Sequence, residues 1–307
     1  MTTSEVRPAT ADEWERWCAA RTDRLTAAVA RWYGAQDGAR EQAERLLEPV
    51  VGAPEKQRAM LASADAAALV AVSVTAGPAR GLLDEVWVEP DRRGQGLGTA
   101  ALAAGTRWLA EHGCTRAVTT IDVADPASVA LCRGWIDLSQ RMVLTLTESP
   151  DLAPGFSARP MTQEEYEPWV REGVDSFVQS LVASGSFDLA GAQAKSERDY
   201  AELLPGGVAT EGQSLTVLES DGRRVGALWL AHHKPATRTF IFDIEIEEAE
   251  RGRGFGRAAM HAAERIALAH GDRSIGLNVF GPNDVARRLY TSLGYRVTDR
   301  TLGLDLD

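Results

Sequence analysis

Two glycine-rich hexapeptides have the residue types and the spacing of phosphate-binding loops. The first is Arg93-Gly94-Gln95-Gly96-Leu97-Gly98, and the second, 158 positions later (93 to 251), is Arg251-Gly252-Arg253-Gly254-Phe255-Gly256. Glycines let a backbone approach a ligand closely, and free N–H groups at the start of a helix attract anions. Each hexapeptide follows a β-like run, which ends at Val88 or Ile246, and opens an apolar helix. The sequence therefore predicts two anion sites of the same construction.

The residues around the loops are also repeated. Arg7-Pro8-Ala9-Thr10, followed by Trp17, reappears as Arg159-Pro160-Met161-Thr162, followed by Trp169. The proline-containing stretch 148–155 lies between the two copies and has the composition of a linker. A length of 307 residues fits two domains. We therefore expect a domain at 1–148, a linker at 149–158 and a second domain at 159–307.

Each half must place its loop between a strand and a helix. In the second half the patterns predict helices at 164–182 and 189–204, and strands at 215–219, 225–231 and 240–246. A helix at 257–270, a strand at 275–279, a helix at 282–293 and a closing strand at 296–304 follow. The first half predicts strands at 68–75, 82–88, 117–123 and 142–147. The expected fold class is α/β, with a mixed, mostly antiparallel sheet flanked by helices in each half.

The composition of the chain limits its possible partners and location. The chain is 44% hydrophobic and 25% charged, which is typical of a globular protein, and no apolar run reaches membrane-spanning length. The net charge of −11 disfavours nucleic acid or an anionic membrane as the main partner. Cys18, Cys114 and Cys132 are odd in number and lack metal-ligand spacing, which favours a reducing, cytoplasmic location and no metal site. The sequence leaves the oligomeric state open.

Three kinds of phosphate loop compete for the hexapeptides. A dinucleotide-binding loop needs a glycine where Thr99 and Arg257 stand, and a P-loop needs a Gly-Lys-Ser/Thr ending that neither copy has. The pattern Arg-x-x-Gly-x-Gly after a strand resembles the acyl-CoA pyrophosphate loop of the GNAT acetyltransferase superfamily. Glycines that only turn a strand into a helix are the alternative, but they do not explain two copies. The resemblance implies that acetyl-CoA contacts Ile246, Arg251, Gly252, Arg253, Gly254, Phe255, Gly256 and Arg257, and in the first half Val88, Arg93, Gly94, Gln95, Gly96, Leu97 and Gly98.

The C-terminal half also resembles the second GNAT signature. Leu277-Asn278-Val279 leads to Asn283, then to a helix that carries Tyr290 and ends at Gly294-Tyr295. Asn283 and Tyr290 are seven positions apart, two helical turns, so both can face one cleft. The resemblance implies that Asn283 helps to bind CoA and that Tyr290 protonates the leaving thiolate. The alternative for Tyr290 is an aromatic ring packed beneath the sheet.

The N-terminal half departs from this second signature. Ala127 stands where Asn283 is expected, no tyrosine follows, and Cys132 is the nearest equivalent of Tyr290. A buried cysteine more commonly fills space than acts as an acid. Three roles are then open for the N-terminal loop. It binds CoA without turnover, stays empty, or forms part of the wall of the substrate pocket of the other domain.

Acetyl transfer sets further requirements in the C-terminal half. In the GNAT pattern, the strand before the loop separates from its neighbour, and a backbone N–H there polarises the thioester carbonyl, which points to Ile246. An alkyl amine is mostly protonated at neutral pH, so a base must take its proton. Asp243 and Glu245 alternate with apolar residues on one strand face and are the candidates for the base. A solvated acidic face is the equally weighted alternative.

These features predict an acyltransferase whose C-terminal domain moves an acetyl group from acetyl-CoA to a primary amine of a small molecule or peptide by direct attack. The alternative is a non-catalytic CoA-binding regulatory or scaffold protein. A complete Asn283 and Tyr290 signature favours catalysis, because a sensor has no need of a leaving-group acid. The identity of the amine is not determined by the sequence.

Overall fold

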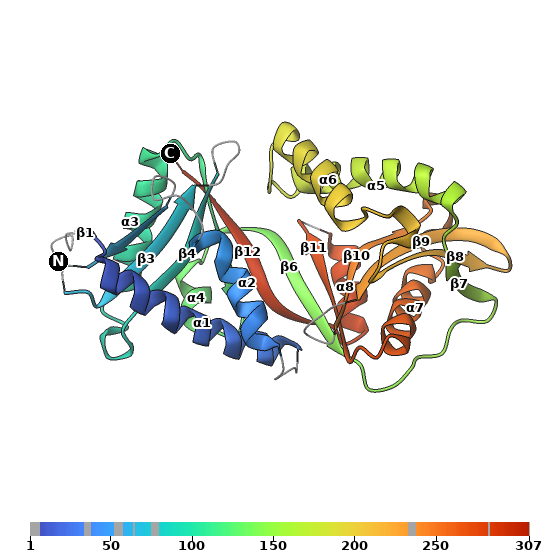
Figure 1. Cartoon of the computed structure of the whole chain (residues 1–307), viewed down its shortest axis with the longest axis horizontal. Helices are drawn as coiled ribbons and strands as arrows, with labels where there is room; N and C mark the ends of the chain where they lie inside the picture. The colour runs from blue at the N-terminus through green and yellow to red at the C-terminus, as the bar shows by residue number, and fades with distance from the viewer. Residues whose placement is uncertain are drawn as a thin grey trace. The chain divides into compact units, whose positions relative to one another are not determined.

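The chain forms two compact units (Figure 1). The computed structural model describes residues 7–33, 38–51, 58–63, 65–74, 80–232, 238–281 and 283–306, so Pro282, the expected start of the last helix, lies outside it. Unit 1 consists of Met1–Val29, Ala39–Leu138 and Asp299–Asp307, and unit 2 consists of Ala30–Gly38 and Ser139–Thr298.

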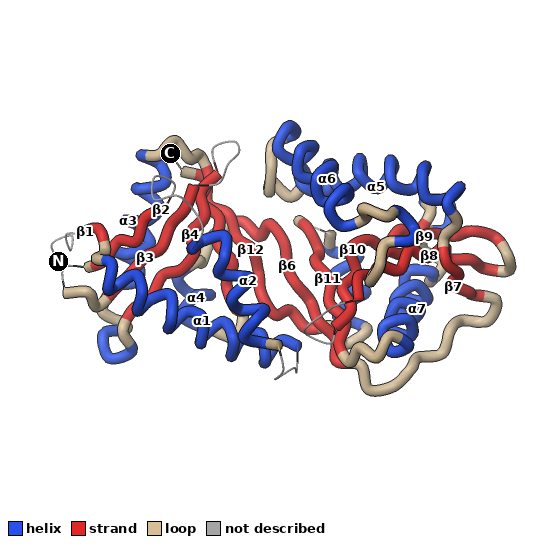
Figure 2. The backbone as a smooth tube through the Cα atoms, viewed as in Figure 1, coloured by secondary structure: helices blue, strands red, loops and turns tan. Residues whose placement is uncertain are grey.

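Unit 2 is built on a sheet in the order β6-β11-β10-β9-β8-β7 (Figure 2). Strands β10 and β11 pair in parallel, and the other strand pairs described in this unit are antiparallel. Its strands are β6 (Ile136–Thr145), β7 (Phe156–Pro160), β8 (Gln213–Ser220), β9 (Arg223–His232), β10 (Arg238–Ile246) and β11 (Ser274–Phe280). Its helices are α5 (Gln163–Ala183), α6 (Leu189–Leu203), α7 (Phe255–Ala269) and α8 (Asp284–Ser292), with short 3₁₀ turns η3 (Gly207–Ala209) and η4 (Glu248–Glu250).

Unit 1 repeats this plan with the sheet order β1-β2-β3-β4-β5-β12. Strands β4 and β5 are parallel, and the rest pair in antiparallel fashion. Its strands are β1 (Arg7–Pro8), β2 (Arg58–Ala62), β3 (Ala68–Val74), β4 (Arg80–Val88), β5 (Arg116–Asp122) and β12 (Arg296–Asp305). Its helices are α1 (Ala11–Tyr33), α2 (Ala39–Val51), α3 (Leu97–Glu111) and α4 (Pro126–Leu131), with the turn η2 (Pro90–Arg92). The predicted fold class is confirmed in both units.

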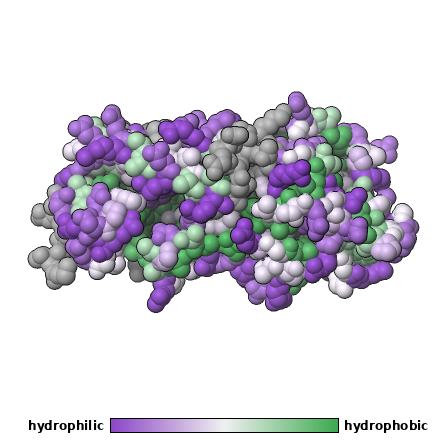
Figure 3. Space-filling model, turned by 90° about the horizontal axis from the view of Figure 1, so that it is seen from below, coloured by the Kyte–Doolittle hydropathy of each residue, from purple (hydrophilic) through white to green (hydrophobic). Residues whose placement is uncertain are grey.

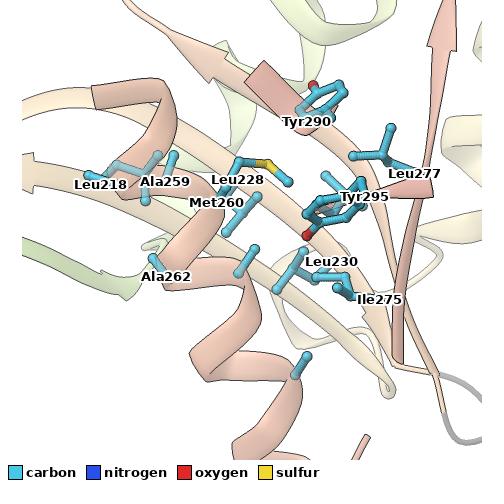
Figure 4. Close-up of a cluster of buried hydrophobic side chains, with 14 of the residues drawn as sticks. Leu218, Leu228, Leu230, Ala259, Met260, Ala262, Ile275, Leu277, Tyr290 and Tyr295 are labelled. Carbon is cyan, nitrogen blue, oxygen red and sulfur yellow. The ribbon is translucent and has the colours of Figure 1, made fainter. Parts of the chain in front are cut away.

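Alternate strand residues of unit 2 face two different cores. Leu228 and Leu230 of β9 pack with Met260 of α7 in one core, which Figure 4 shows, whereas Trp229 packs with Trp169 of α5 in the other. The pair α5 and α6 therefore covers one sheet face and α7 covers the opposite face, as the two-residue period of a strand requires. The glycine loop and the acidic strand residues thus meet different helices.

The last strand of each repeat lies in the sheet of the other unit. The sequence placed 296–304 as the strand that closes the second half. Instead, Asp299–Asp305 of β12 pairs with β5 in unit 1, while Ser139–Thr145 of β6 pairs with β11 in unit 2. Hydrophobic periodicity predicts a strand but not its neighbour, so this exchange had no local signal. The boundaries at 148 and 159 remain a prediction about the two sequence repeats.

The face shown in Figure 3 is mostly hydrophilic or weakly polar, with apolar residues between the polar ones. Among the described residues, no helix combines the length and apolarity that crossing a membrane requires.

Candidate active site

The glycine loop of unit 2 exposes backbone N–H groups at the start of α7. Gly252 and Gly254 have φ values of 75° and 89°, a left-handed conformation that glycine adopts without strain. A Cβ added at either position would meet no atom within 4 Å, so the space over the loop is open. Side chains of Thr162, Asp188 and Asn283 cap α5, α6 and α8, whereas α7 begins at Gly254 without a side-chain cap. The first turn of α7 is therefore available to an anion.

The side chains of the loop hold its shape. Arg251 Nε donates to the Ile246 carbonyl oxygen at 3.0 Å, which fixes the loop to the end of β10. Arg253 is bonded to Glu250, and Arg257 Nη2 donates to Ser292 Oγ on α8 at 2.7 Å. These three arginines are therefore already engaged, so the groups that the loop offers to an anion are mainly its N–H groups.

Two residues of the loop, Phe255 and Gly256, contribute to packing within unit 2. The Phe255 ring stacks 6.2 Å from Phe156 and packs against the α7 core. A Cβ on Gly256 would lie 3.2 Å from Leu289 Cδ2, so this glycine lets α8 approach α7 closely. Both residues still offer backbone N–H groups at the helix start.

Asn283, the residue expected to help bind CoA, caps the helix α8. Its Oδ1 accepts a hydrogen bond from Ala286 N at 3.1 Å.

Strands β10 and β11 separate before the loop. Their parallel pairing runs from Arg238 to Ile241 and no further, and a bulge follows between Ile241 and Asp243. The Glu247 N–H donates to Val225 on β9 at 3.0 Å. Successive N–H groups of a strand point to opposite edges, so the Ile246 N–H points to the edge that β11 has left. In the described strands, the Ile246 N–H therefore has the orientation that the predicted role requires, and the role itself remains a prediction.

Asp243 and Glu245 share one face of β10, the face covered by α6. Both carboxylates raise the pKa of Tyr200 on α6, after the larger effect of burial, so all three groups lie near one another. Burial and the neighbouring Glu245 raise the pKa of Asp243 to about 6, against a smaller opposing effect of the Ile244 N–H. Asp243 is only partly exposed and is a stronger base than an ordinary aspartate.

Tyr290 of α8 lies at the edge of the α7 core and is 7% exposed. Figure 4 shows its hydroxyl pointing away from Tyr295, whose own hydroxyl donates to Glu264 at 3.3 Å. Burial, and then the Asp243 carboxylate, raise the pKa of Tyr290 to about 12. The structure therefore places Tyr290 within electrostatic reach of Asp243, and its hydroxyl keeps its proton at neutral pH.

The loop of unit 1 has the same geometry. Gly94 and Gly96 have φ values of 76° and 82°, and a Cβ added to either would meet nothing within 4 Å. Arg93 Nε donates to the Val88 carbonyl oxygen at 3.1 Å, just as Arg251 does to Ile246. The helix α3 also starts without a side-chain cap.

The other loop residues of unit 1 pack locally. Gln95 Oε1 accepts from Arg92 Nε at 3.2 Å, and Leu97 packs into the core beneath α3. A Cβ on Gly98 would lie 3.6 Å from Val88 Cγ2. Cys132, the nearest equivalent of Tyr290, is buried against Ile121. Unit 1 thus keeps the anion cradle and lacks the tyrosine hydroxyl.

Sequence reasoning missed the residues of α5 and α6 that surround Asp243 and Glu245. Tyr200 packs against Trp169 and Trp229, with ring centroids 6.2 Å and 5.0 Å apart. A Cβ on Gly173 would lie 2.5 Å from the Tyr200 hydroxyl oxygen, so α5 carries a glycine where Tyr200 approaches it. The only sequence signal was a glycine in the middle of a helical pattern, which often marks such close packing.

In the described residues, no group of three or more His, Cys, Asp or Glu side chains is arranged to hold a metal ion. The groups described above are backbone N–H groups, two carboxylates and a tyrosine.

Comparison with known proteins identifies the family. Residues 14–135 and 183–295, one segment in each repeat, match the acetyltransferase (GNAT) family. The chain therefore belongs to the GNAT family and is a tandem member of it, an N-acetyltransferase with two copies of the fold.

Relatives of known sequence and structure agree. The uncharacterized N-acetyltransferases YdgE and YycN of Bacillus subtilis are each 31% identical, over 147 and 143 residues, which covers 47% and 46% of this chain and 94% and 92% of theirs. The GCN5-related N-acetyltransferase of Sphaerobacter thermophilus has a TM-score of 0.59 at 20% identity, covering 100% of this chain and 96% of that one. A tandem GNAT protein from the clavulanic acid biosynthesis pathway has a TM-score of 0.53 at 16% identity, covering 99% and 98%. These structures share the two-repeat fold.

Proposed function

We propose that unit 2 transfers an acetyl group from acetyl-CoA to a primary amine of a small molecule or peptide by direct attack, and that unit 1 does not catalyse transfer. The observation that carries the proposal is the position of Asp243. It follows the bulge of β10 where β11 has separated, its pKa is raised to about 6, and it lies within electrostatic reach of Tyr290. A candidate base and a candidate acid are thus close enough to influence each other.

The residues present fit acetyl-CoA. The open N–H groups from Gly252 to Gly256, at the uncapped start of α7, are suited to its pyrophosphate. Bound acetyl-CoA would supply an acetyl group as a thioester, which a neutral amine can attack. The Ile246 N–H, on the free edge of β10, supports the proposed role of polarising the carbonyl oxygen. The equivalent cradle of unit 1, from Val88 to Gly98, supports CoA binding without turnover.

Asp243 and Tyr290 would divide the proton transfers. The Asp243 carboxylate, ionised above about pH 6, accepts a proton from the incoming ammonium group. The Tyr290 hydroxyl, protonated up to about pH 12, donates a proton to the departing sulfur. Glu245 adds negative charge beside Asp243, which raises the basicity of Asp243 and attracts a cationic amine. The unpaired thiols of Cys18, Cys114 and Cys132 support a reducing compartment such as the cytoplasm.

The test is the pH dependence of acetyl-CoA turnover with a panel of amines, measured by thiol release. The wild type should lose kcat as the pH falls through about 6, because Asp243 becomes protonated. Asp243→Asn should lose this acid limb and about 10²-fold in kcat. Asp175→Asn, which changes an exposed carboxylate on α5, is the matched control and should keep both.

Two outcomes would contradict the proposal. Full turnover and an unchanged acid limb in Asp243→Asn would remove Asp243 as the base. Tight acetyl-CoA binding with no thiol release for polyamines, aminoglycosides, amino acids, amino sugars or peptide N-termini would favour the non-catalytic regulatory class.

A further inference from the structure

A cavity of about 300 Å³ lies between α5 and the strands β9 and β10 of unit 2. Among its lining residues are Trp169, Glu172, Arg224, Glu245 and Glu247. This volume is at the lower end of the range for small-molecule sites and far too small for a folded partner. It opens on the strand face that carries Glu245, two positions after Asp243.

The cavity has an excess of negative charge. Arg224 Nε lies 3.3 Å from Glu247 Oε1, so this pair is internally compensated. Glu172 on α5 and Glu245 on β10 have no ion-pair partner within the described part of the chain. Two uncompensated carboxylates from different elements make the cavity suitable for a cation.

Trp169 supplies a second and independent indication of a ligand. Its side chain is 1% exposed, and its indole N–H has no hydrogen-bond acceptor in the described structure. Leaving a buried donor unsatisfied costs about 1–3 kcal/mol. The equivalent Trp17 of unit 1 donates to Glu85 Oε2 at 2.6 Å, so the same scaffold can satisfy this donor internally. In unit 2, Trp169 lines the cavity and its buried N–H is left for another acceptor.

We infer that this cavity recognises the acceptor of the proposed acetyl transfer, and that the acceptor is a small diamine that also carries a neutral oxygen. The inference rests on the proposed function, because it assigns the reacting amine to Asp243. The second ammonium group binds between Glu172 and Glu245, and the oxygen accepts the Trp169 N–H. Strand residues two apart are separated by roughly 6–7 Å, which sets the spacing of the two nitrogen atoms.

Four amines distinguish the contribution of the second ammonium group from that of the neutral oxygen. They are 1,4-diamino-2-butanol with both groups, 1,4-diaminobutane without the hydroxyl, 1-amino-2-butanol without the second amine, and butylamine with neither. The wild type should show its highest kcat/KM with 1,4-diamino-2-butanol and its lowest with butylamine. Each recognition element should contribute about three- to tenfold, through KM, because Glu172 is exposed at the cavity edge.

Two variants test the assigned side chains. Glu172→Gln should remove most of the preference for diamines over monoamines. Glu167→Gln, an exposed change on the same helix away from the cavity, should keep the preference. Trp169→Phe should lower the ratio of hydroxylated to non-hydroxylated amines. This ratio is taken within one variant, so a loss of stability does not affect it.

Equal kcat/KM for all four amines in the wild type would overturn the inference while leaving the proposed acetyl transfer intact. If no amine is acetylated, the proposed function fails. Titration calorimetry with 1,4-diamino-2-butanol then tests whether the cavity binds the diamine, independently of acetyl transfer. Binding that weakens in Glu172→Gln but not in Glu167→Gln would support the subsite. Absence of binding to wild-type protein would overturn it.

Discussion

Equivalent strand positions in the two units carry a carboxylate with opposite surroundings. Glu85 of β4 and Asp243 of β10 both follow a bulge in their strand. Glu85 accepts the Trp17 indole N–H at 2.6 Å and pairs with Arg21 at 3.0 Å and Arg24 at 2.7 Å. Trp17, Arg21 and Arg24 recur at helical spacing, so one face of α1 holds this carboxylate.

In unit 2, the residues at the equivalent positions do not hold Asp243 in the way that Trp17, Arg21 and Arg24 hold Glu85. The repeat places Gly173 and Ser176 of α5 where α1 has its two arginines. Gly173 admits the Tyr200 hydroxyl, and the Trp169 N–H stays without an acceptor. Asp243, buried beside another carboxylate instead of two cations, has its pKa raised to about 6.

The glycine loops, in contrast, barely differ between the units. This supports the proposal that unit 1 does not catalyse transfer, because its carboxylate is held in ion pairs and no tyrosine stands at the Tyr290 position. Trp87 reinforces this difference, since it stands where unit 2 has Glu245, with Arg24 4.2 Å and Arg93 5.0 Å from its ring centroid. The same scaffold uses these positions for stability in one unit and leaves them open in the other.

The largest expected effect comes from changing the same glycine in the two loops and comparing acetyl-CoA binding and turnover. Gly254→Asp places a carboxylate against the CoA phosphates, and like charges at close range cost several kcal/mol. Acetyl-CoA affinity in unit 2 and turnover should fall by about 10²-fold or more. Asp is among the residues that adopt a positive φ more often than others, and the matched change in unit 1 carries the same backbone strain. Gly96→Asp in unit 1 is the matched change and should leave turnover near wild type. Calorimetry and thiol release measure the two quantities, and equal losses in both variants would make the units functionally equivalent.

The next effect concerns the proton donor. Tyr290→Phe keeps the ring but removes the hydroxyl, so kcat should fall by about 10²-fold, the low end for a positioned acid, because a thiol leaves readily. Acetyl-CoA affinity should change little. Cys132→Ala in unit 1 should leave kcat unchanged. Loss of turnover in Cys132→Ala, with Tyr290→Phe still active, would exchange the roles of the two units.

A smaller effect should follow from imitating unit 1 in unit 2. Ser176→Arg places a cation at the position equivalent to Arg24, which should lower the pKa of Asp243 from about 6 towards its usual range. A weaker base should reduce kcat by about three- to tenfold and move the acid limb to lower pH. Gln193→Arg adds the same charge at an exposed site of α6 and should shift neither. An acid limb that stays in place in Ser176→Arg would break the equivalence between the two helix faces.

The remaining effects are on stability, a separate quantity, and they should have opposite signs in the two units. Glu85→Gln leaves two arginines without their anion and should lower stability by about 1–2 kcal/mol. Asp243 has a raised pKa in the folded state, so its stabilising contribution is present at low pH and is lost as the pH rises through about 6. Asp243→Asn should therefore raise stability at pH 8, by about 1–3 kcal/mol, and the gain should disappear below pH 4.

Denaturant unfolding at pH 8 and pH 4 measures both changes. A loss of stability in Asp243→Asn at pH 8 would show that Asp243, like Glu85, is held by favourable partners.

The sequence by itself determined the two loops, the order of strands and helices around them, and the family. These features depend on local chemistry, because glycine is needed at positive φ, apolar periodicity follows the element type, and caps lie within a few residues of the helix start. The strand face shared by Asp243 and Glu245 followed from the same two-residue period. The absence of a tyrosine near Cys132 was also visible without a structure.

Only the tertiary structure decided what surrounds these residues. The partners of Glu85 lie 61 to 68 positions away in the chain, and Tyr200 lies on a helix that no motif connects with Asp243. The exchange of β6 and β12 was likewise hidden, since a strand pattern is satisfied by either sheet. Burial, ion pairing and strand partners are set by which distant segments pack together, and that packing determines whether a carboxylate is a structural anchor or a base.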